Sequence, residues 1–302
     1  DEIAFSPTRG REGARPVRLR APYRRPRLTR LRPPAASASL ADSCLPPSLS
    51  SKWNETRIKQ RDMRAMNALA RRRQHCEGEA LEIALAGERV ACDPSGVLYL
   101  PAQHCLIVSD LHLEKGAAFA RRGMFLPPYD TAATLALLSL SLERYSPARV
   151  VCLGDSFHDR KGAALMPAGE RDRLSVLMKG RDWIWIAGNH DPEPPQGIGG
   201  ETLLEVTIGA LAFRHEPSAG HRRGEVSGHL HPVARLAGRG SRRACFATDG
   251  SRMILPSFGV TTGGLNVLDR AFHGLFDMQK ALACMIGHAG IYPVRFGALA
   301  SG

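Results

Sequence analysis

The sequence predicts a layered α/β fold with either one mixed sheet or two facing sheets. From about residue 80, short apolar runs of β type alternate with segments of helical spacing, and beyond residue 200 nearly all runs are of β type. Alternating β and α units followed by consecutive strands are typical of sheets covered by helices. A hydrophobic content of 43% in 302 residues is enough to form a core.

The elements follow from the spacing of apolar residues. A helix is expected over residues 129–145, where Leu135, Leu138 and Leu142 have helical spacing, and another over 168–180. A hairpin is expected over residues 81–101. The other strands are expected within residues 105–110, 149–155, 182–191, 202–217, 224–236 and 242–259. Trp183 and Trp185 lead into a buried strand, so we expect both to belong to the core.

Residues 1–75 form a basic segment that we expect to be disordered, and residues 76–302 form the folded domain. Residues 1–73 hold 18 Lys and Arg against 6 Asp and Glu, which accounts for the whole formal net charge of +12. The segment is rich in Arg, Pro and Ser and lacks helical or strand periodicity, so it cannot bury enough surface to fold alone.

Two functions fit this basic segment, a nucleic-acid-binding arm and an organelle transit peptide. The alternative is that the native chain begins at Met63 or Met66 and that the upstream residues are not native sequence. Prolines interrupt the amphipathic helix that a transit peptide forms, and the chain starts at Asp1, so we favour this alternative.

The sequence predicts a soluble cytoplasmic protein that does not enter membranes. No apolar run approaches the roughly 18 residues of a membrane span, and no apolar secretory segment stands at the N-terminus. The seven cysteines are scattered and never spaced C-x-x-C, which excludes a zinc ribbon and argues against a disulfide framework. We expect reduced, mostly buried thiols.

Polar clusters follow five of the predicted strands. They are SDLH (Asp110, His112), GDSFHD (Asp155, His158, Asp159), GNHD (Asn189, His190, Asp191), RHEP (His215) and GHLH (His229, His231). Each alone is weak, because such residues often cap turns or lie satisfied in a core. In α/β sheets, however, ligand sites gather at the carboxyl ends of strands, so we expect all five clusters to converge. The GHLH histidines are two residues apart, which on a strand places them on one face. Glu114, next to the first cluster, is expected in a solvated loop.

Together the clusters predict a centre with two metal ions. They offer carboxylate, imidazole and amide oxygen but no thiolate, which suits Mn²⁺, with Fe or Zn as alternatives, better than a structural zinc. Six or seven such groups exceed the needs of one ion. Two ions sharing a carboxylate use them all and can clamp a phosphoryl group for in-line attack.

The ordered series D-x-H, G-D-x-x-H/D, G-N-H-D, H and G-H-x-H resembles the calcineurin-like metallophosphoesterase superfamily over about residues 80–270. The flanking stretches SDLHLEKG, GDSFHD, GHLHP and LPSFGVTTGGLNVLD are similar to its ligase-associated DNA damage response endonuclease branch, the PdeM type. The superfamily resemblance implies a four-layer αββα sandwich with a dinuclear site at the strand ends.

The resemblance also implies a role for each candidate residue. The first metal would be bound by Asp110, His112 and His231, the second by Asn189, His215 and His229, with Asp155 as the bridge. A hydroxide shared by both metals would be the nucleophile. His190 matches a histidine that is not a ligand and that donates a proton to the leaving oxygen or stabilises the phosphoryl charge. Asp191 would orient its loop. For His158 and Asp159, substrate contact and a structural role both stay open.

Three functions are therefore considered. The branch resemblance implies a phosphodiesterase that acts as a DNA endonuclease in bacterial repair, in a system with a DNA ligase and a helicase. A small-molecule or cyclic-nucleotide phosphodiesterase or phosphatase would share every ligand. A scaffold for a repair complex is the third, and His190 argues against it. The neutral charge beyond residue 73 gives nucleic-acid binding no independent support, although arginines flank the last ligands: Arg214, Arg222, Arg223, Arg235, Arg239, Arg242 and Arg243.

Overall fold

The computed structural model describes residues 78–124, 129–238 and 240–301. The basic segment 1–75, the domain boundary at residue 76, Cys44, Cys76 and Arg239 lie outside the described residues. The five described cysteines are buried and free, as expected (Cys92, Cys105, Cys152, Cys245 and Cys284). Within the described part of the chain, no helix combines the length and the apolar character that crossing a membrane requires.

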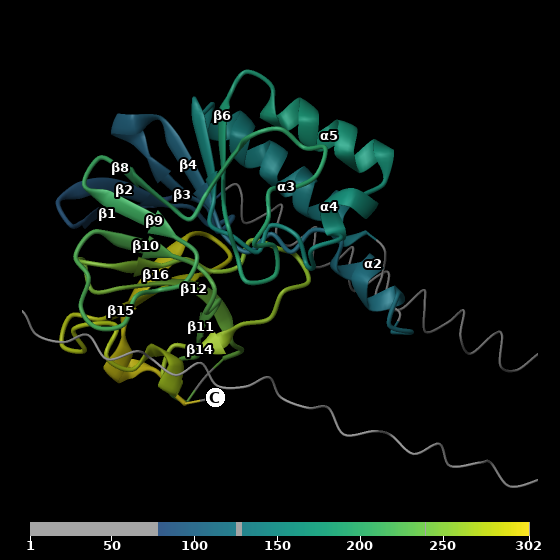
Figure 1. Cartoon of the computed structure of the whole chain (residues 1–302). Coiled ribbons are helices and arrows are strands. Elements are labelled where there is room, and N and C mark those ends of the chain that lie inside the picture. The colour runs from purple at the N-terminus through teal and green to yellow at the C-terminus, as the bar shows by residue number, and fades with distance from the viewer. Residues whose placement is uncertain (1–77, 125–128, 239, 302) are drawn as a thin grey trace, which may run out of the picture. The chain divides into compact units, whose positions relative to one another are not determined.

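The first sheet has seven strands in chain order, and its strands after β3 run parallel (Figure 1). The strands are β1 (Leu81–Leu85), β2 (Glu88–Cys92), β3 (Leu98–Leu100), β4 (Cys105–Val108), β5 (Arg149–Cys152), β6 (Asp182–Ile186) and β7 (Glu201–Leu203). Because β4, β5 and β6 are parallel neighbours, their carboxyl ends meet at one edge of the sheet.

The second sheet has the order β14-β11-β12-β13-β10-β9-β8, with β15 paired to β12 and β16 paired to β15. In it β9, β10 and β13 are parallel. Its strands are β8 (Glu205–Ile208), β9 (Leu211–Arg214), β10 (Glu225–Ser227), β11 (Pro232–Ala234), β12 (Arg243–Thr248), β13 (Met253–Ile254), β14 (Leu265–Asn266), β15 (Leu282–Ile286) and β16 (Ile291–Arg295). The strands expected beyond residue 200 are therefore present, and β14 to β16 add to them.

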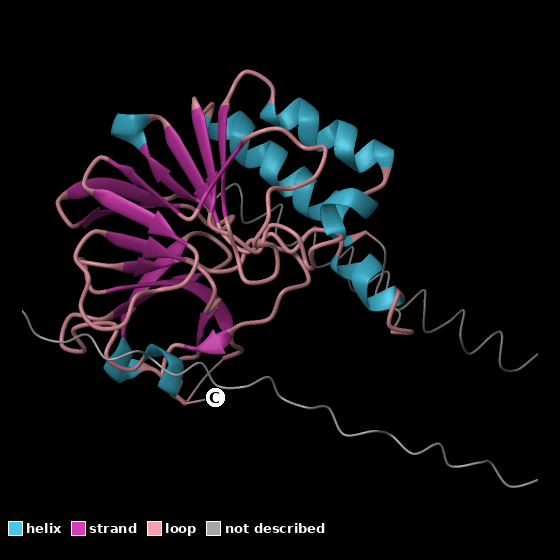
Figure 2. Cartoon of the chain, viewed as in Figure 1, coloured by secondary structure: helices cyan, strands magenta, loops and turns pink. Residues whose placement is uncertain are grey.

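Helices cover the outer face of the first sheet (Figures 1 and 2). They are α3 (Asp130–Tyr145), α4 (Gly162–Leu165) and α5 (Ala168–Met178), so both predicted helices are confirmed. A further helix, α2 (Lys115–Ala120), contacts α3 and lies away from the sheet in Figure 1. The predicted stripe on α3 is buried, with Leu135, Leu138 and Leu142 at 2%, 0% and 2% exposure. Helix α3 stops at Tyr145 because Ser146 adopts a left-handed conformation and Pro147 cannot continue the ladder.

Alternating side chains of the two sheets fill separate layers. Ile107 of β4 packs between the sheets, whereas Leu106 and Val108 face the helices together with Trp183 and Trp185, which are core residues as predicted. On the far side of the second sheet, Phe272 and Phe296 cover the alternate residues of β12 and β15.

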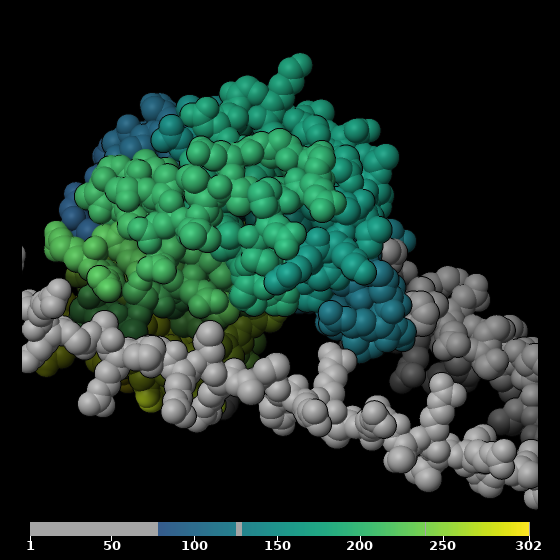
Figure 3. All heavy atoms as spheres, in the orientation of Figure 1, coloured from purple at the N-terminus to yellow at the C-terminus, as the bar shows by residue number. Residues whose placement is uncertain are grey.

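These two phenylalanines belong to the 3-10 helices η2 (Arg270–Phe272) and η3 (Phe296–Ala298); a third, η1 (Pro101–Gln103), precedes β4. Figure 2 shows such short turns outside the second sheet, and Figure 3 shows the two halves of the domain packed against each other on the viewed face. The predicted layered fold is confirmed, and its second outer layer consists of 3-10 turns in the described residues.

Candidate metal centre

The five polar clusters converge at the edge where the two sheets meet. They follow β4, β5 and β6 of the first sheet and β9 and β10 of the second. Ligand atoms of Asp110, His112 and His231 all lie within 4.8 Å of one another, and so do those of Asp155, His215 and His229. Asn189 joins the second group, with its Oδ1 2.9 Å from His215 Nε2. All seven predicted ligands are thus brought together.

The segments that carry Asp110, His112, His229 and His231 are loops, which corrects the strand geometry expected for G-H-x-H. Strand β4 ends at Val108 and β10 at Ser227. The residues that follow adopt positive φ angles, 53° at Asp110, 45° at His112, 66° at His229 and 45° at His231. Such conformations cost about 1–3 kcal/mol each in residues other than glycine and gather at active sites. Of the two GHLH histidines, His231 consequently belongs to the group with Asp110, and His229 belongs to the group with Asp155.

Each carboxylate at the centre is held by a backbone amide from another loop. His229 N donates to Asp110 Oδ2 over 3.0 Å, and His190 N donates to Asp155 Oδ1 over 2.9 Å. The loops also bond to each other, since His112 N donates to the carbonyl oxygen of Asp155 over 2.9 Å. The ligands are therefore fixed in place by the polypeptide itself.

Glycines make this close approach of the loops feasible. A Cβ atom at Gly188 would collide with the backbone nitrogen of Asp155, and one at Gly228 would collide with Ser109 Oγ. The glycine in each of G-D, G-N-H and G-H-x-H is a signal that the sequence analysis did not use. It marks positions where one ligand loop packs directly on another.

The first group has unsatisfied atoms that fit a cation. Asp110 Oδ1, His112 Nδ1 and His231 Nε2 are buried and have no hydrogen-bond partner among the described residues. Asp110 Oδ1 lies 3.0 Å from His231 Nε2, but the two atoms lack hydrogen-bond geometry. A short distance alone does not make a hydrogen bond. Buried polar atoms are costly when unpaired, and a shared divalent ion would satisfy all three.

The second group has a fixed histidine tautomer. His215 Nδ1 lies 2.7 Å from the carbonyl oxygen of Leu153, which can only accept, so Nδ1 carries the proton. Nε2 therefore presents its lone pair to the centre, 3.4 Å from Asp155 Oδ1 and 3.2 Å from His229 Nδ1. A carbonyl that orients the outer nitrogen in this way is typical of metal-binding histidines.

Electrostatics favours a neutral imidazole at His112 and His229. Burial lowers the pKa of His112 to about 3, and burial followed by the nearby His215 lowers the pKa of His229. Burial opposes ionisation of Asp110, but the nearby charge of His231 outweighs it and lowers the pKa of Asp110. Burial also lowers the pKa of His231, but the Asp110 carboxylate outweighs burial and raises it. His112 and His229 thus present free lone pairs to a metal ion near neutral pH.

His190 lies at the edge of the centre and is partly exposed, whereas Asp110, His112, Asp155 and His215 are buried. Its Nδ1 is 2.8 Å from the carbonyl oxygen of His158, so Nδ1 carries a proton. Its Nε2 is 3.8 Å from Asp155 Oδ2, and its side chain is 39% exposed. The ring can therefore reach both the centre and a molecule that enters from solvent.

The remaining residues of the two middle clusters have different surroundings. The ring of His158 stacks on His190 at 5.3 Å, and with His112 these two form a third group with ligand spacing. Asp159 points to the surface, where it pairs with Arg121 at 2.6 Å. Asp191 accepts from the backbone nitrogen of Phe157 over 3.0 Å, an arrangement that would let it orient its loop, and burial raises its pKa to about 7.

Glu114 is not in a solvated loop, and that expectation was wrong. Its side chain is buried, at 5% exposure, and accepts from Thr131 Oγ1 over 2.9 Å. Thr131 belongs to α3, seventeen residues away, and also accepts from the Glu114 backbone nitrogen. Glu114 therefore anchors the first ligand loop to the helical layer.

The comparisons with known proteins agree with this geometry. A family model for calcineurin-like phosphoesterases matches residues 104–249, the range that contains every candidate ligand. Residues 104–249 are a calcineurin-like phosphoesterase domain. The predicted superfamily is thereby confirmed, and the two sheets with their helices are a metallophosphoesterase fold.

Two solved structures are similar to this chain. The nuclease MPE of Pseudomonas putida is 26% identical, has a TM-score of 0.58, and the match covers 72% of this chain and 100% of that chain. Yfce, a phosphoesterase from E. coli, is 17% identical with a TM-score of 0.31, over 63% of this chain and 98% of that one. No curated protein matches the sequence.

Proposed function

We propose that this phosphoesterase holds two divalent cations and hydrolyses phosphodiester bonds within DNA, in bacterial DNA repair. The observation that carries the proposal is the convergence of two groups of ligand atoms from five loops on one edge of the fold. The similarity of this chain to the Pseudomonas putida nuclease supports nucleic acid as the substrate class. Association with a DNA ligase and helicase rests on the resemblance of the motifs alone.

The ligand sets follow from the two groups. We assign the first cation to Asp110, His112 and His231, the second to Asn189, His215 and His229, and the bridging position to Asp155. When bound, such a pair supplies positive charge for the phosphoryl oxygens and a nucleophile near neutral pH. The oxygen and imidazole donors favour Mn²⁺, with Fe or Zn as alternatives.

His190 is assigned as the proton donor to the leaving oxygen. Its Nδ1 proton is held by the His158 carbonyl, so the ring is oriented with Nε2 toward the centre. A positioned imidazole that protonates a leaving group contributes about 10²–10⁴-fold to a rate. His158 would then support His190 through its backbone and ring.

A groove on the His231 side favours a polymeric, anionic substrate. A pocket of about 390 Å³ beside His231 shares Arg242, Ala244 and Ser257 with a second pocket of about 230 Å³, which also contains Arg243. Because they share these three residues the two pockets adjoin, and we call them together the arginine groove, which is lined by Arg242 and Arg243. Cations along such a path would hold the phosphates on one side of the scissile bond.

Three of the other arginines near the ligands are engaged elsewhere. Arg214 pairs with Glu205, Arg223 donates to the carbonyl of Ala86, and Arg235 donates to the carbonyl of Ser301. Arg242 also donates to a carbonyl, that of Gly264, over 2.7 Å, but it does so while it lines the groove. Arg242 is therefore the arginine with the best position for a phosphate contact.

Arg242→Ala is expected to lower kcat/KM for DNA about tenfold and to reduce the slope of log kcat/KM against log salt concentration by about 0.9, as for one lost phosphate contact. Hydrolysis of a small aryl phosphodiester should stay within twofold. Arg235→Ala is the matched control, because that arginine also donates to a carbonyl but does not line the groove. Equal losses on both substrates would contradict a role in holding DNA.

The main alternative is a phosphodiesterase or phosphatase for small molecules or cyclic nucleotides, which the formally neutral charge of residues 74–302 favours. The test is to incubate the full chain and Mn²⁺ with closed circular DNA, an aryl phosphodiester and a cyclic nucleotide, each with and without a chelator. We expect nicking of the DNA that the chelator abolishes and that added Mn²⁺ restores. Ester hydrolysis with intact DNA would establish the alternative, and metal binding without any hydrolysis would indicate a scaffold.

A further inference from the structure

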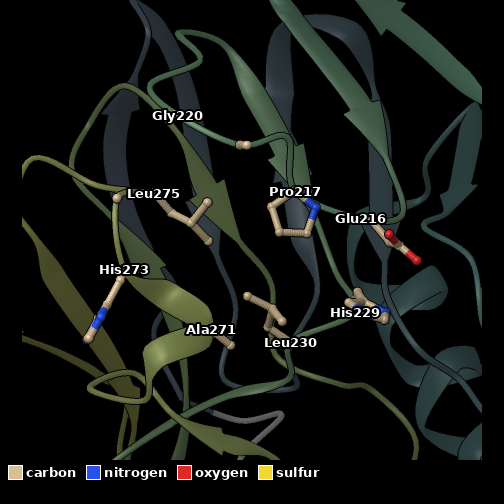
Figure 4. A pocket seen from close by; sticks show the side chains of 10 residues that line it. Glu216, Pro217, Gly220, His229, Leu230, Ala271, His273 and Leu275 are labelled. Carbon is tan, nitrogen blue, oxygen red and sulfur yellow. The ribbon is translucent and has the colours of Figure 1, made fainter.

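A second pocket, of about 470 Å³, adjoins the candidate metal centre on the His229 side. It is distinct from the arginine groove, which begins at His231. Its lining comprises Glu216, Pro217, Ala219, Gly220, His229, Leu230, Ala271, His273, Gly274 and Leu275. In Figure 4, Glu216 and His229 lie side by side at one end, and His273 lies at the other. Because His229 belongs to both the pocket wall and the centre, a group in the pocket would lie next to the reacting phosphate.

The pocket is preformed, because one buried arginine ties its two walls together. Arg252 is 1% exposed and donates to the carbonyl oxygens of Ser218 over 2.7 Å and Leu275 over 3.0 Å. Its charge is balanced by Glu225, 2.7 Å away and also buried. Glu225 in turn accepts from the Ser218 backbone nitrogen over 3.1 Å. The loop around Ser218 and the segment at Leu275 are therefore held at a fixed separation.

The chemistry of the lining selects a flat, largely apolar group with hydrogen-bond donors at its edge. Pro217, Leu230 and Leu275 face the space between them (Figure 4). Glu216, an exposed carboxylate at the end near His229, would repel a phosphate but accept hydrogen bonds from amino or ring N–H groups. Nucleobases have these features, apolar faces and N–H donors at the edge. The volume lies within the range of about 300–1,000 Å³ for small-molecule sites.

We propose that this pocket binds the nucleobase of the nucleotide attached to the scissile phosphate, with Glu216 accepting a hydrogen bond from the edge of the base. The inference rests on the proposed function, because it needs a nucleotide at the centre. The inference adds that the two sides of the centre bind different parts of the substrate. The base on one side enters an apolar pocket, and phosphates on the other side follow Arg242.

The test fills the pocket without touching a candidate ligand. Ala271 lines the pocket and is exposed in the 3-10 helix η2, so Ala271→Trp places a large side chain there without burying one in the core. Ala298 is likewise exposed in a 3-10 helix, η3, and does not line the pocket, which makes Ala298→Trp the matched control. Two chromogenic diesters are compared, the p-nitrophenyl ester of deoxycytidine 5′-monophosphate and methyl p-nitrophenyl phosphate, which has no base.

We expect Ala271→Trp to lower kcat/KM at least tenfold for the nucleotide ester and less than twofold for the methyl ester, with two metal ions retained. Ala298→Trp should change neither. Glu216→Gln should lower kcat/KM only for the nucleotide ester. Equal losses on both esters, or no loss on either, would overturn the inference. If the unchanged protein hydrolyses neither ester, the proposed function fails first, so the two failures are distinguishable.

Discussion

Replacing His190 by alanine is expected to lower kcat for phosphodiester hydrolysis by about 10²–10⁴-fold while two metal ions stay bound. The side chain is 39% exposed at the edge of the centre, so the ring can take up a second proton from solvent. The His158 carbonyl holds the Nδ1 proton, and the protonated ring would therefore deliver its proton from Nε2. Alanine removes the donor but keeps the backbone nitrogen that bonds to Asp155 Oδ1. The measurements are kcat for an aryl phosphodiester and the metal content per chain.

Metal content decides between two roles for this histidine. His112, His158 and His190 also form a group that could hold an ion, so the competing role for His190 is that of a ligand. Loss of an ion in His190→Ala would show that it is a ligand and contradict the assignment. A rate within tenfold of the unchanged protein would also contradict it. His221→Ala, at an exposed histidine that belongs to none of these groups, is the control and should leave both measurements unchanged.

The positions of the strands and the convergence of the clusters could be predicted because both follow from local patterns. The apolar runs before Asp110, Asp155 and Asn189 are strands of one parallel sheet, so their carboxyl ends had to meet at one edge. His215 and His229 follow two parallel strands of the second sheet in the same way. Nothing beyond strand spacing and parallel pairing was needed to gather the candidate ligands.

The details of the centre could not be predicted because they depend on contacts between distant segments. The positive φ angles at Asp110 and His229 arise where loops pack on each other. The two-residue spacing of D-x-H and H-x-H does not reveal them, because the same spacing also occurs in strands. The burial of Glu114 depends on Thr131, which lies on a helix seventeen residues later. Strand β14 is only two residues long, too short for any periodicity to appear.

Asp155→Asn is expected to lower kcat/KM for every phosphodiester by at least about 1,000-fold and to reduce the bound metal below two ions per chain. A carboxylate between two cations supplies charge to both, and several kcal/mol of transition-state stabilisation depend on those cations, at about 1.4 kcal/mol for each tenfold change in rate. Asparagine has the same shape and can still accept from His190 N, so the loop should keep its position. The loss would then be one of charge rather than of fold.

The control for this substitution lies four residues away in the same motif. Asp159 pairs with Arg121 at the surface, so Asp159→Asn should keep two ions and stay within a few-fold of full activity. Metal analysis and kcat/KM for the aryl diester, measured on both variants, separate a bridging carboxylate from a merely acidic motif. Two retained ions and near-normal rates in Asp155→Asn would remove the bridge from the assignment. In that case each cation would have to be held by its own group alone, and Asp110 would be the sole carboxylate among the seven assigned ligands that binds a metal.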